Sequence, residues 1–453
     1  MSGKYDQVNA LVLGAGLSGE AAALLLLARQ GRVLVLDEND EAKHAEAAAR
    51  VRQAGGRAVF GAAGLPQEPF DVCVVSPAFP MRHPWVTECR RRGLPMISEL
   101  ELGGCYWPGK ILAVTGSKGK SSLVKFCADT LEDSGFTASP AGNYGIPLCR
   151  LALERPDLAW AVTEVSSFQM EHTSTFSPDI AILLNLQADH FDRHADMAEY
   201  KALKLSLFSA MRPGSVALLP AGLGDGGTIP QGVDVLRFGS DAGCDWVYAG
   251  HAVMGMLNGR ISKVELQGSW FDNAVLGLAA AAGVAALRHA GLNDSQIENG
   301  LASFQPLPHR VQRIGVSKQG VWYVDDSKAT SLAATAAALR MVRKPVRLIA
   351  GGLLKEDDLE SIKELLTQTT KKVYLIGRCA GQMFQAWSAS VPCEECGTLE
   401  RAVALAVREA QNGETVLLSP GTASFDQFTG YRERGERFTA QVRAVADLGA
   451  FLF

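Results

Sequence analysis

Short apolar runs alternate with longer stretches of mixed polarity along most of the chain. The first run lies at residues 10–13, an alanine- and leucine-rich stretch follows at residues 20–29, and a second apolar run lies at residues 33–36. Apolar runs separated by stretches of helical periodicity are typical of strands that are buried on both faces of a parallel sheet. The pattern therefore predicts that the chain opens with a strand–helix–strand unit.

The same alternation continues through the chain and predicts an α/β protein. Further strands are expected at residues 71–75, 111–114, 159–163, 179–184, 321–324, 346–350, 373–376 and 415–418, and helices at residues 198–208 and 273–290. A length of 453 residues suits about three domains. Glycine-rich turns follow the strands at 10–13 and 111–114. On this basis we expect a Rossmann-like domain at residues 1–102, a central parallel-sheet domain of the P-loop ATPase type at residues 103–303, and a second Rossmann-like domain at residues 304–453. The helix at 273–290 is expected to be the last large element of the central domain.

Composition narrows the class of protein. The formal net charge is −4 and the basic residues are scattered, which argues against a nucleic-acid-binding face. No apolar run has membrane-spanning length, and no apolar signal region opens the chain, so we expect a cytoplasmic protein. The nine cysteines are dispersed, which favours reduced thiols over a disulfide framework.

A glycine-rich turn follows the first predicted strand. Gly14, Gly16 and Gly19 form a G-x-G-x-x-G pattern, and Asp37 ends the second strand. In this context the pattern is typical of a nucleotide or dinucleotide site, with a phosphate chain at the helix N-terminus. Taken alone, the turn leaves an NAD-dependent oxidoreductase open.

A second loop, TGSKGKSS at residues 115–122, follows the predicted strand at 111–114. Its amides suit a phosphate chain, Lys120 can reach the terminal phosphates, and the Ser121 hydroxyl suits Mg²⁺. We therefore expect ATP to bind here. The loop departs from the pattern G-x-x-x-x-G-K-[ST] because Val114 stands in place of the first glycine. An ordinary glycine turn is the alternative.

Other polar clusters also follow predicted strands. Glu164, after the strand at 159–163, is placed to ligate Mg²⁺, or it is an ordinary acid at a strand end. Residues 185–194, NLQADHFDRH, could hold a second metal or a phosphate, with a hydrogen-bonded loop histidine as the alternative. Residues 325–330 and 419–426 offer hydroxyls, amides and a lysine to a carboxylate or another anion, or they are helix N-caps.

These clusters, in this order, resemble the Mur ligases of cell-wall synthesis over essentially the whole chain. The motifs that carry the resemblance are DSKAT at 326–330, LPHR at 307–310, EVSSFQME at 164–171, AGNYGIP at 141–147 and SPGTASFDQF at 419–428. DSKAT discriminates best, because family members that add other amino acids carry other sequences there. The resemblance implies an ATP-dependent amide ligase that adds D-glutamate to UDP-N-acetylmuramoyl-L-alanine through an acyl phosphate, in peptidoglycan precursor synthesis.

The resemblance also implies roles for individual residues. Those expected to contact ATP are Gly116, Ser117, Lys118, Gly119, Lys120, Ser121, Ser122, Asn273, Arg310 and Asp326. Those expected to contact the UDP substrate are Leu17, Ser18, Asp37, Ser76, Asn143, Ser166 and Gln169. Those expected to hold D-glutamate are Lys328, Thr330, Lys355, Ser424, Phe425 and Tyr431. Two Mg²⁺ sites are implied, one at Ser121 and Glu164 and one at His190 and a carbamylated Lys204; Lys120, Glu164, His190 and Lys204 would be the catalytic residues.

The chain departs from the family pattern at several points. Lys118 stands where the family usually has Asn, Ser269-Trp270 replaces a His-Asn pair, and Leu353-Leu354 replaces Asp-Gly. A related ligase with a different amino acid or nucleotide-sugar substrate therefore stays open, as does a nucleotide-binding regulatory protein without turnover. The expected partners are small-molecule substrates rather than nucleic acid or a membrane, and we expect a monomer.

Overall fold

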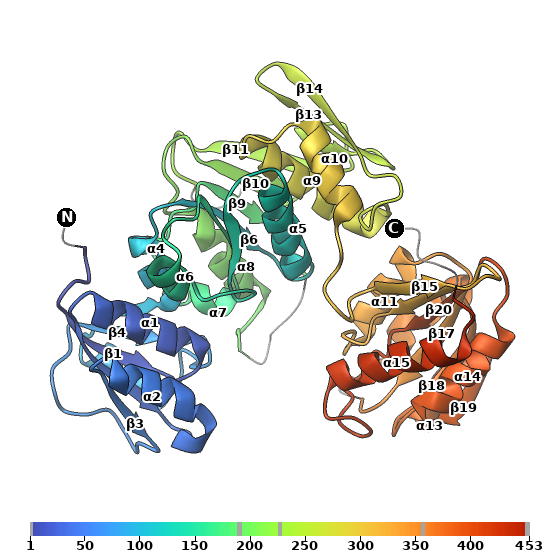
Figure 1. Cartoon of the computed structure of the whole chain (residues 1–453), viewed down its shortest axis with the longest axis horizontal. Coiled ribbons are helices and arrows are strands. Elements are labelled where there is room, and N and C mark those ends of the chain that lie inside the picture. The colour runs from blue at the N-terminus through green and yellow to red at the C-terminus, as the bar shows by residue number, and fades with distance from the viewer. Residues whose placement is uncertain (1–2, 188–192, 225–228, 355–357, 449–453) are drawn as a thin grey trace. The chain divides into compact units, whose positions relative to one another are not determined.

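The computed structural model describes residues 3–187, 193–224, 229–354 and 358–448. The chain forms two compact units, Met1–Asp272 with Gly277–Phe304, and Asn273–Leu276 with Gln305–Phe453. The first unit holds two sheets and the second holds one, and helices pack against each sheet (Figure 1). This arrangement confirms the predicted α/β fold class. Within the described residues, no helix is long and apolar enough to cross a membrane.

The first sheet has five parallel strands in the order β3-β2-β1-β4-β5. Its elements are β1 Asn9–Leu13, α1 Leu17–Ala28, β2 Arg32–Asp37, η1 Glu41–His44, α2 Ala45–Gln53, β3 Arg57–Phe60, β4 Val72–Val75, α3 Pro84–Arg91 and β5 Met96–Ser98. The predicted strand–helix–strand unit is confirmed, but α1 begins earlier than predicted. Gly19 makes this tight start possible, because a Cβ there would lie 1.8 Å from the Gly14 carbonyl oxygen.

The central sheet has nine strands in the order β14-β13-β12-β11-β10-β9-β6-β8-β7. Neighbours from β7 to β12 are parallel, as expected for the predicted parallel sheet, and β6, β8 and β9 fall at predicted positions. Strands β7, β10, β11 and β12 were not predicted, and neither were the antiparallel strands β13 and β14. The strands are β6 Lys110–Thr115, β7 Ala138–Gly142, β8 Trp160–Glu164, β9 Ile180–Leu183, β10 Val216–Pro220, β11 Asp234–Gly239, β12 Trp246–Tyr248, β13 Ala252–Leu257 and β14 Arg260–Glu265. The helices are α4 Glu99–Tyr106, α5 Lys120–Asp133, α6 Leu148–Glu154, α7 Ser167–Met170, α8 Met197–Leu205, η2 Ser206–Phe208, α9 Ala274–His289 and α10 Asp294–Ser303.

The presence of α10 shows that the expectation of α9 as the last large element was wrong. The sequence of α10 is largely polar, and its buried apolar side chains are Ile297 and Leu301, so its periodic signal is weak. The helix also lies along β14, the strand at the end of the sheet. Asp294 accepts a hydrogen bond from the Lys263 amide (3.2 Å). One turn later, Glu298 accepts one from the amide of Glu265, the last residue of β14 (3.0 Å).

The third sheet, in the second unit, has the order β15-β16-β20-β17-β18-β19. Only the β15–β16 pair is antiparallel among these described strands. The elements are β15 Gln312–Val316, β16 Trp322–Asp325, α11 Leu332–Met341, β17 Val346–Gly351, η3 Leu359–Ile362, α12 Lys363–Thr369, β18 Thr370–Ile376, α13 Ala380–Trp387, β19 Cys393–Gly397, α14 Leu399–Glu409, β20 Thr415–Leu418 and α15 Tyr431–Val445.

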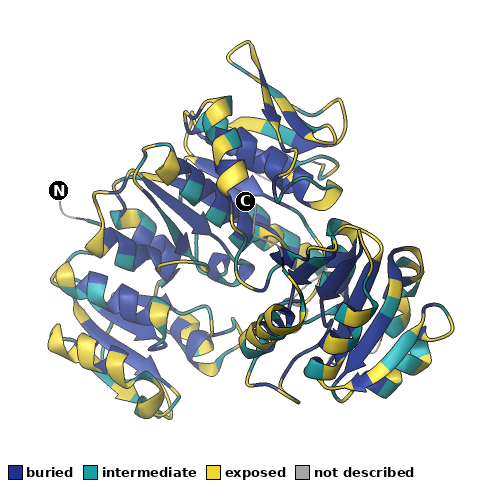
Figure 2. Ribbon diagram, turned by 45° about the vertical axis from the view of Figure 1, so that its right-hand side comes forward, coloured by how far each residue is buried: buried dark blue, intermediate teal, exposed yellow. Residues whose placement is uncertain are grey.

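Burial follows the sequence pattern that predicted these elements. Figure 2 shows most strands as buried and the outward faces of many helices as exposed, whereas β3, β13 and β14 are partly exposed. In α14, for example, Leu399, Ala402, Val403 and Ala406 are buried at helical spacing. Such a stripe supplies one apolar face to the core while the remaining positions stay polar.

A buried carboxylate connects α4 to α6 in the first unit. Glu99 is 2% exposed, and its Oε1 accepts a hydrogen bond from the Cys149 amide (2.6 Å). Burial raises the pKa of Glu99 to about 7, although the hydrogen bonds from Cys149 act in the opposite direction. The ionised form of Glu99 is therefore unfavourable in the folded state.

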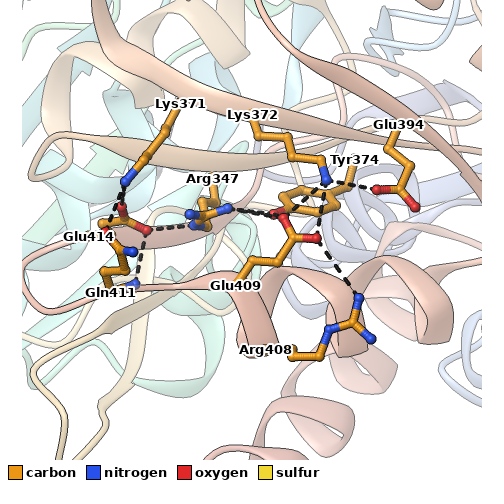
Figure 3. A network of polar contacts seen from close by, with 9 residues as sticks. All are labelled: Arg347, Lys371, Lys372, Tyr374, Glu394, Arg408, Glu409, Gln411 and Glu414. Atoms are coloured by element: carbon orange, nitrogen blue, oxygen red, sulfur yellow. Dashed lines mark hydrogen bonds and ion pairs between the residues drawn. The ribbon is translucent and has the colours of Figure 1, made fainter.

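A network of ion pairs lies at the amino ends of β17 and β18 (Figure 3). Arg347 Nε donates to Glu414 Oε2 (2.5 Å), and Arg347 Nη1 donates to Tyr374 Oη (2.8 Å). Lys371 Nζ donates to the other oxygen of Glu414 (2.5 Å). Lys372 Nζ extends the network by donating to Glu409 Oε2 (3.0 Å). The Arg347 and Glu414 side chains are 6% and 3% exposed, so removing one partner would leave a charge buried without its counterion.

Glu99→Gln should reduce the pH dependence of unfolding. Because the folded pKa of about 7 exceeds the ordinary value of 4.5, the stability linked to Glu99 is present below pH 4.5 and is lost as pH rises to 7. Over this window the wild type should lose up to about 3 kcal/mol more than Glu99→Gln in urea unfolding. The control variant Glu46→Gln, which changes an exposed residue, should show the same pH dependence of unfolding as the wild type. Parallel pH profiles for wild type and Glu99→Gln would contradict the expectation.

Glu414→Gln should lower the free energy of unfolding of the second unit by about 3 kcal/mol, because Arg347 and Lys371 lose their counterion. Burial would raise the pKa of Glu414, but Lys371 and Arg347 lower it below 4.5. The stability from Glu414 is therefore present above pH 4.5 and is lost as pH falls through the lower folded pKa. Glu360→Gln, which removes an exposed pair with Lys363, should change unfolding by less than about 1 kcal/mol. Equal losses in the two variants, measured by denaturant unfolding, would count against the network.

Candidate active site

The UDP-substrate residues predicted in the first sheet lie at the carboxyl ends of its strands. Leu17 and Ser18 begin α1, Asp37 ends β2, and Ser76 follows β4. Leu17 is 68% exposed, so a large apolar side chain stands open beside the glycine-rich turn. Ligands of open parallel sheets bind at this edge, and the structure therefore brings these four residues to the expected side of the sheet.

Asp37 holds the glycine-rich turn in place. Its Oδ2 accepts a hydrogen bond from the Ala15 amide (2.7 Å), and its Oδ1 accepts one from the Asn39 amide (2.8 Å). Burial would raise the pKa of Asp37, but these hydrogen bonds lower it below its ordinary value. The described contacts of Asp37 therefore fix the backbone of the turn.

The loop between β6 and α5 depends on glycine and on a side chain from the segment that follows β9. Gly116 has φ 146° and Gly119 has φ 86°, backbone conformations that residues with a Cβ rarely adopt. Asn185 Oδ1 accepts hydrogen bonds from the amides of Ser117 (3.1 Å) and Lys118 (2.9 Å). Two amides that were expected to face a phosphate are thus bonded to Asn185. This residue opens the segment 185–194, which was predicted as a metal or phosphate site without a role for Asn185 itself.

Two of the predicted catalytic lysines meet at this loop. Lys120 Nζ donates to the carbonyl oxygens of Gly116 (2.8 Å) and Ser117 (3.1 Å), and Lys204 Nζ donates to the same Gly116 oxygen (2.9 Å). Lys204 is 1% exposed and lies over the Tyr200 ring, 4.5 Å from its centroid. A buried lysine beside a phosphate-type loop is unlike the solvated lysine that helical periodicity alone would suggest.

Tyr200 is a loop contact that the sequence analysis missed. Its hydroxyl donates to Ser117 Oγ (3.1 Å), and Ser117 Oγ donates to the Gln187 carbonyl (2.9 Å). These bonds connect α8 and the segment after β9 to the loop. Tyr200 and Lys204 are four residues apart and share one face of α8. This spacing is the one sequence signal that could have indicated the Tyr200 contact.

Glu164 lies beside the start of the same loop. It pairs with Val114 across β8 and β6, and its Oε1 accepts a hydrogen bond from Asn143 Nδ2 (2.7 Å). Its Oε2 is buried and has no hydrogen-bond partner among the residues that the structure describes. A buried carboxylate oxygen of this kind calls for a donor or a cation.

The residues around Glu164 fit a Mg²⁺ ion that also binds phosphate. Carboxylate and hydroxyl oxygens suit Mg²⁺, which in nucleotide sites takes its remaining ligands from phosphate and water. Within the described ranges, no three His, Cys, Asp or Glu side chains gather into a metal site of their own. Glu164 Oε2 and the Ser121 hydroxyl at the start of α5 have the oxygen chemistry that such an ion requires, and their role as its ligands stays a prediction.

Ser166 and Gln169 form the capping box of α7. Ser166 Oγ accepts from the Gln169 amide (3.3 Å), and Gln169 Oε1 accepts from the Ser166 amide (3.0 Å). Their described contacts are therefore those of a helix N-terminus. Their predicted contact with the UDP substrate stays a prediction.

In the second unit, Arg310 lies in a strained loop before β15. Its neighbours His309 and Val311 have φ 62° and φ 46°, values that are costly for a β-branched residue such as valine. His309 Nδ1 pairs with Asp325 Oδ2 (2.7 Å), and Asp326 Oδ1 accepts from the Val311 amide (3.1 Å). These contacts hold the strained backbone, which marks the loop as a candidate functional segment.

Asp326 also binds the opposite loop, since its Oδ2 accepts from Ser419 Oγ (2.8 Å). Burial raises the pKa of Asp326 to about 7, against the effect of the bonds from Ser419 and Val311. The structure thus brings the segments 325–330 and 419–426 together, as the predicted anion site requires.

The predicted amino-acid residues collect around these two segments. Lys328 Nζ lies 3.9 Å from the centroid of the Tyr431 ring. Burial would raise the pKa of Tyr431, but Arg432 and Lys328 lower it. Thr330 is partly exposed in the loop before α11. Ser424 is buried and Phe425 is 69% exposed, next to each other in the loop after β20.

Arg434 is a buried residue that the sequence analysis missed. Its Nε donates to Ser327 Oγ (3.0 Å), and its Nη2 donates to the carbonyls of Ser327 (2.8 Å) and Thr422 (3.2 Å). Burial lowers the pKa of Arg434 to about 10. Its contacts tie the two segments of the predicted amino-acid site, while its position inside α15 resembles that of any charged helix residue.

Of three further predicted residues, Asn273 is described by the structure and two are not. Asn273 precedes α9, and its Oδ1 accepts from the amides of Val275 (3.2 Å) and Leu276 (3.0 Å). His190 and Lys355 lie outside the described residues.

Two family models match the chain. The Mur ligase middle domain matches residues 114–266, and the Mur ligase, glutamate ligase domain matches residues 309–421. The first match includes the loop of Lys120 and Glu164, and the second includes the strained loop around Arg310.

Known proteins extend the match to nearly the full length. A UDP-N-acetylmuramoylalanine--D-glutamate ligase of Acidobacterium capsulatum is 32% identical over 458 residues, and one of Nitratidesulfovibrio vulgaris is 35% identical over 446 residues. Each alignment covers 96% of both chains.

Solved structures share the fold at lower identity. The MurF ligase of Thermotoga maritima in complex with ADP has a TM-score of 0.58 at 18% identity, covering 83% of this chain and 96% of its own. The UDP-N-acetylmuramate-alanine ligase MurC of Thermotoga maritima has a TM-score of 0.57 at 15% identity, covering 96% and 99%. With relatives above 30% identity along almost its whole length, and with the loops of its candidate site inside both matched domains, this chain belongs to the Mur ligase family.

Proposed function

We propose that the protein is an ATP-dependent ligase that joins D-glutamate to UDP-N-acetylmuramoyl-L-alanine in peptidoglycan precursor synthesis. The observation that carries the proposal is the loop at 116–122, which has two lysines at its carbonyls. Beside it lies Glu164 Oε2, a buried carboxylate oxygen that has no hydrogen-bond partner among the described residues. The relatives named as D-glutamate ligases support the choice of substrates. The DSKAT run at 326–330 supports the same choice.

The proposed reaction has two steps. A carboxylate oxygen of the UDP substrate attacks the γ-phosphorus of ATP, and the bond from that phosphorus to the β–γ bridging oxygen breaks, giving an acyl phosphate and ADP. The amine of D-glutamate then attacks the acyl carbon, loses a proton, and displaces phosphate. Both steps need charge stabilisation at the phosphoryl group and close positioning of the nucleophile.

The residues divide this work by position. Lys120 would bind the β- and γ-phosphates, for which it would exchange its present carbonyl partners. Leu17, Ser18, Asp37 and Ser76, with Asn143, would hold the UDP substrate. Lys328 would bind a carboxylate of D-glutamate, and Thr330, Ser424 and Tyr431 would complete that site.

Two Mg²⁺ sites are part of the proposal. Ser121 and Glu164 would hold one ion, and Lys204, as a carbamate, would hold the other together with His190. Mg²⁺ supplies positive charge to the transferring phosphoryl group. Ser121 and Glu164 would supply oxygen ligands at the loop. The buried Glu164 Oε2, which has no hydrogen-bond partner in the described parts of the chain, supports this.

The test is phosphate release with ATP, Mg²⁺, UDP-N-acetylmuramoyl-L-alanine and D-glutamate, omitting each component in turn. The expected result is release that needs every component, with a product heavier by one glutamate residue. Release with another amino acid or nucleotide sugar would keep the family chemistry and change the substrate. No release with any combination, or oxidation of NADH, would overturn the proposal.

Lys204→Ala should lower turnover by on the order of 10²–10³, because it removes a proposed ligand of the second Mg²⁺ and thereby weakens charge stabilisation at the reacting phosphoryl group. A small carboxylic acid should restore part of the activity if Lys204 is carbamylated. Lys201→Ala, on the same helix, serves as the matched control and should keep wild-type turnover. Full activity of Lys204→Ala would remove this residue from the mechanism, and loss without rescue would argue against a carbamate.

Lys328→Ala should raise the KM for D-glutamate by about 10–100-fold, the range expected for a lost charge-assisted hydrogen bond. The KM for ATP should change by less than about twofold. Initial rates over a D-glutamate series measure the first effect and an ATP series the second. Lys318→Ala, which removes an exposed lysine paired with Asp447, is the control. Equal shifts in both KM values would mean that Lys328 is not the amino-acid anchor.

A further inference from the structure

Arg193 makes four hydrogen bonds with its guanidinium group in the first unit. Its Nε and Nη2 donate to the two oxygens of Glu171 (2.8 and 2.7 Å). Its Nη1 donates to the Pro77 carbonyl (2.6 Å), and Nη2 also donates to the Phe79 carbonyl (3.0 Å). The side chains of the ion pair are 11% and 4% exposed, so the charges are largely withdrawn from water.

These four bonds join two segments that are distant in sequence. Pro77 and Phe79 belong to the turn that starts at Ser76, after β4 of the first sheet, whereas Glu171 follows α7, beyond the capping box at Ser166. Each segment carries predicted contacts to the UDP substrate. The fixed fork of a guanidinium sets both the distance and the angle between its partners, which a point charge such as lysine does not do.

The turn is linked on its other side to the end of β2. Phe79 packs edge-on against His83, with ring centroids 4.7 Å apart, and His83 Nε2 lies 3.2 Å from Glu38 Oε2. Glu38 follows Asp37 directly. The turn after β4 is therefore linked to the end of β2 and, through Arg193, to the segment after β8. The UDP substrate is expected at all three strand ends.

The central-sheet side of the contact is fixed independently of Arg193. His194 Nε2 lies 2.9 Å from Ser167 Oγ, and its ring lies 5.4 Å from that of Tyr200. Tyr200 in turn donates to Ser117 in the phosphate loop (3.1 Å). Arg193 itself lies over the Phe168 ring, 4.3 Å from its centroid. Loss of the Arg193 side chain should therefore release the turn at 76–80. Helix α7 should stay connected to the loop at 116–122 through His194 and Tyr200.

The two sheets are also held together elsewhere. Arg150 Nη2 donates to Glu20 Oε1 (3.0 Å), and the Ser98 amide donates to the His172 carbonyl (2.7 Å). Because these contacts do not involve Arg193, its replacement should loosen the turn without separating the sheets.

We propose that Arg193 is a positioning residue, which holds the turn at 76–80 against α7 so that the UDP substrate is bound with its carboxylate directed to the phosphate loop. This inference rests on the proposed function. It assigns to Arg193 a contribution to binding of the UDP substrate, made through the carbonyls of Pro77 and Phe79.

Arg193→Met tests the proposal, with Arg193→Lys as a second variant that keeps the charge. The KM for UDP-N-acetylmuramoyl-L-alanine should rise at least tenfold in Arg193→Met and by a smaller factor in Arg193→Lys. The KM values for ATP and D-glutamate should stay within twofold. Calorimetric titration of the UDP substrate without ATP should show the same loss of affinity.

Arg92→Met is the matched control. Arg92 also bonds a carboxylate, Glu88 (2.8 Å), and a turn carbonyl, that of Pro66 (2.6 Å), but this turn is not part of the predicted site. The control should keep the wild-type KM, while its thermal midpoint reports the cost of losing such contacts. A fall in turnover of Arg193→Met and Arg193→Lys with an unchanged KM and unchanged affinity for the UDP substrate would overturn the inference.

The outcomes separate this inference from the proposed function. Binding of the UDP substrate by the wild type without ligation would overturn the proposed function, and the affinity of Arg193→Met would still decide the role of Arg193. No binding of the UDP substrate by the wild type would overturn both.

Discussion

The Gly116 carbonyl is the point on which the candidate active site depends. It accepts hydrogen bonds from Lys120 and from Lys204, so it gathers two cations from different helices at one oxygen. The Asn185 side chain fixes the amides beyond it. A triphosphate that binds here therefore exchanges one set of partners for another instead of ordering free side chains, and part of the entropic cost of ordering these lysines is met when the chain folds.

In the second unit, the buried ion-pair network and the candidate site lie at opposite ends of the parallel strands. The Arg347–Glu414 network lies at the amino ends of the strands (Figure 3), whereas Asp325, Asp326 and Ser419 lie at or just beyond the carboxyl ends. The non-glycine residues of this unit with positive φ, among those described, are His309 and Val311, and they also lie on the carboxyl side. The arrangement fits the general tendency of parallel sheets to place ligand groups at one edge, and it lets the opposite edge carry buried ion pairs without affecting the site.

Much of the fold could be predicted from the sequence because buried parallel strands are nearly pure apolar runs. β1, β6, β17 and β20 all fall close to their predicted positions. The antiparallel strands β13 and β14 were missed because their residues are partly exposed and mixed in character, and α10 was missed because its apolar stripe is short. In each case the local pattern was weak and tertiary packing decided the structure.

The candidate site was predictable where chemistry follows a strand end, as at Glu164 and Asp326. Asn185 and Arg193 lie in the segment 185–194 that was predicted as a metal or phosphate site, but their contacts, like those of Arg434, could not be predicted. A polar residue in a loop or on a helix has the same local signature whether it faces water or a buried partner. Arg193 finds Pro77 at a separation of 116 residues, and Arg434 finds Ser327 at 107. No spacing rule within one element reaches such partners. The roles of the predicted substrate and metal residues stay predictions.

The carboxylates of α10 have a consequence for association with other chains. An edge strand offers a row of unpaired amides to which another strand can add. On β14 the amides of Lys263 and Glu265 already donate to side chains of the same chain, so an incoming strand would have to displace two acidic groups before it could pair. The long central sheet is thereby protected at this edge against growth into aggregates.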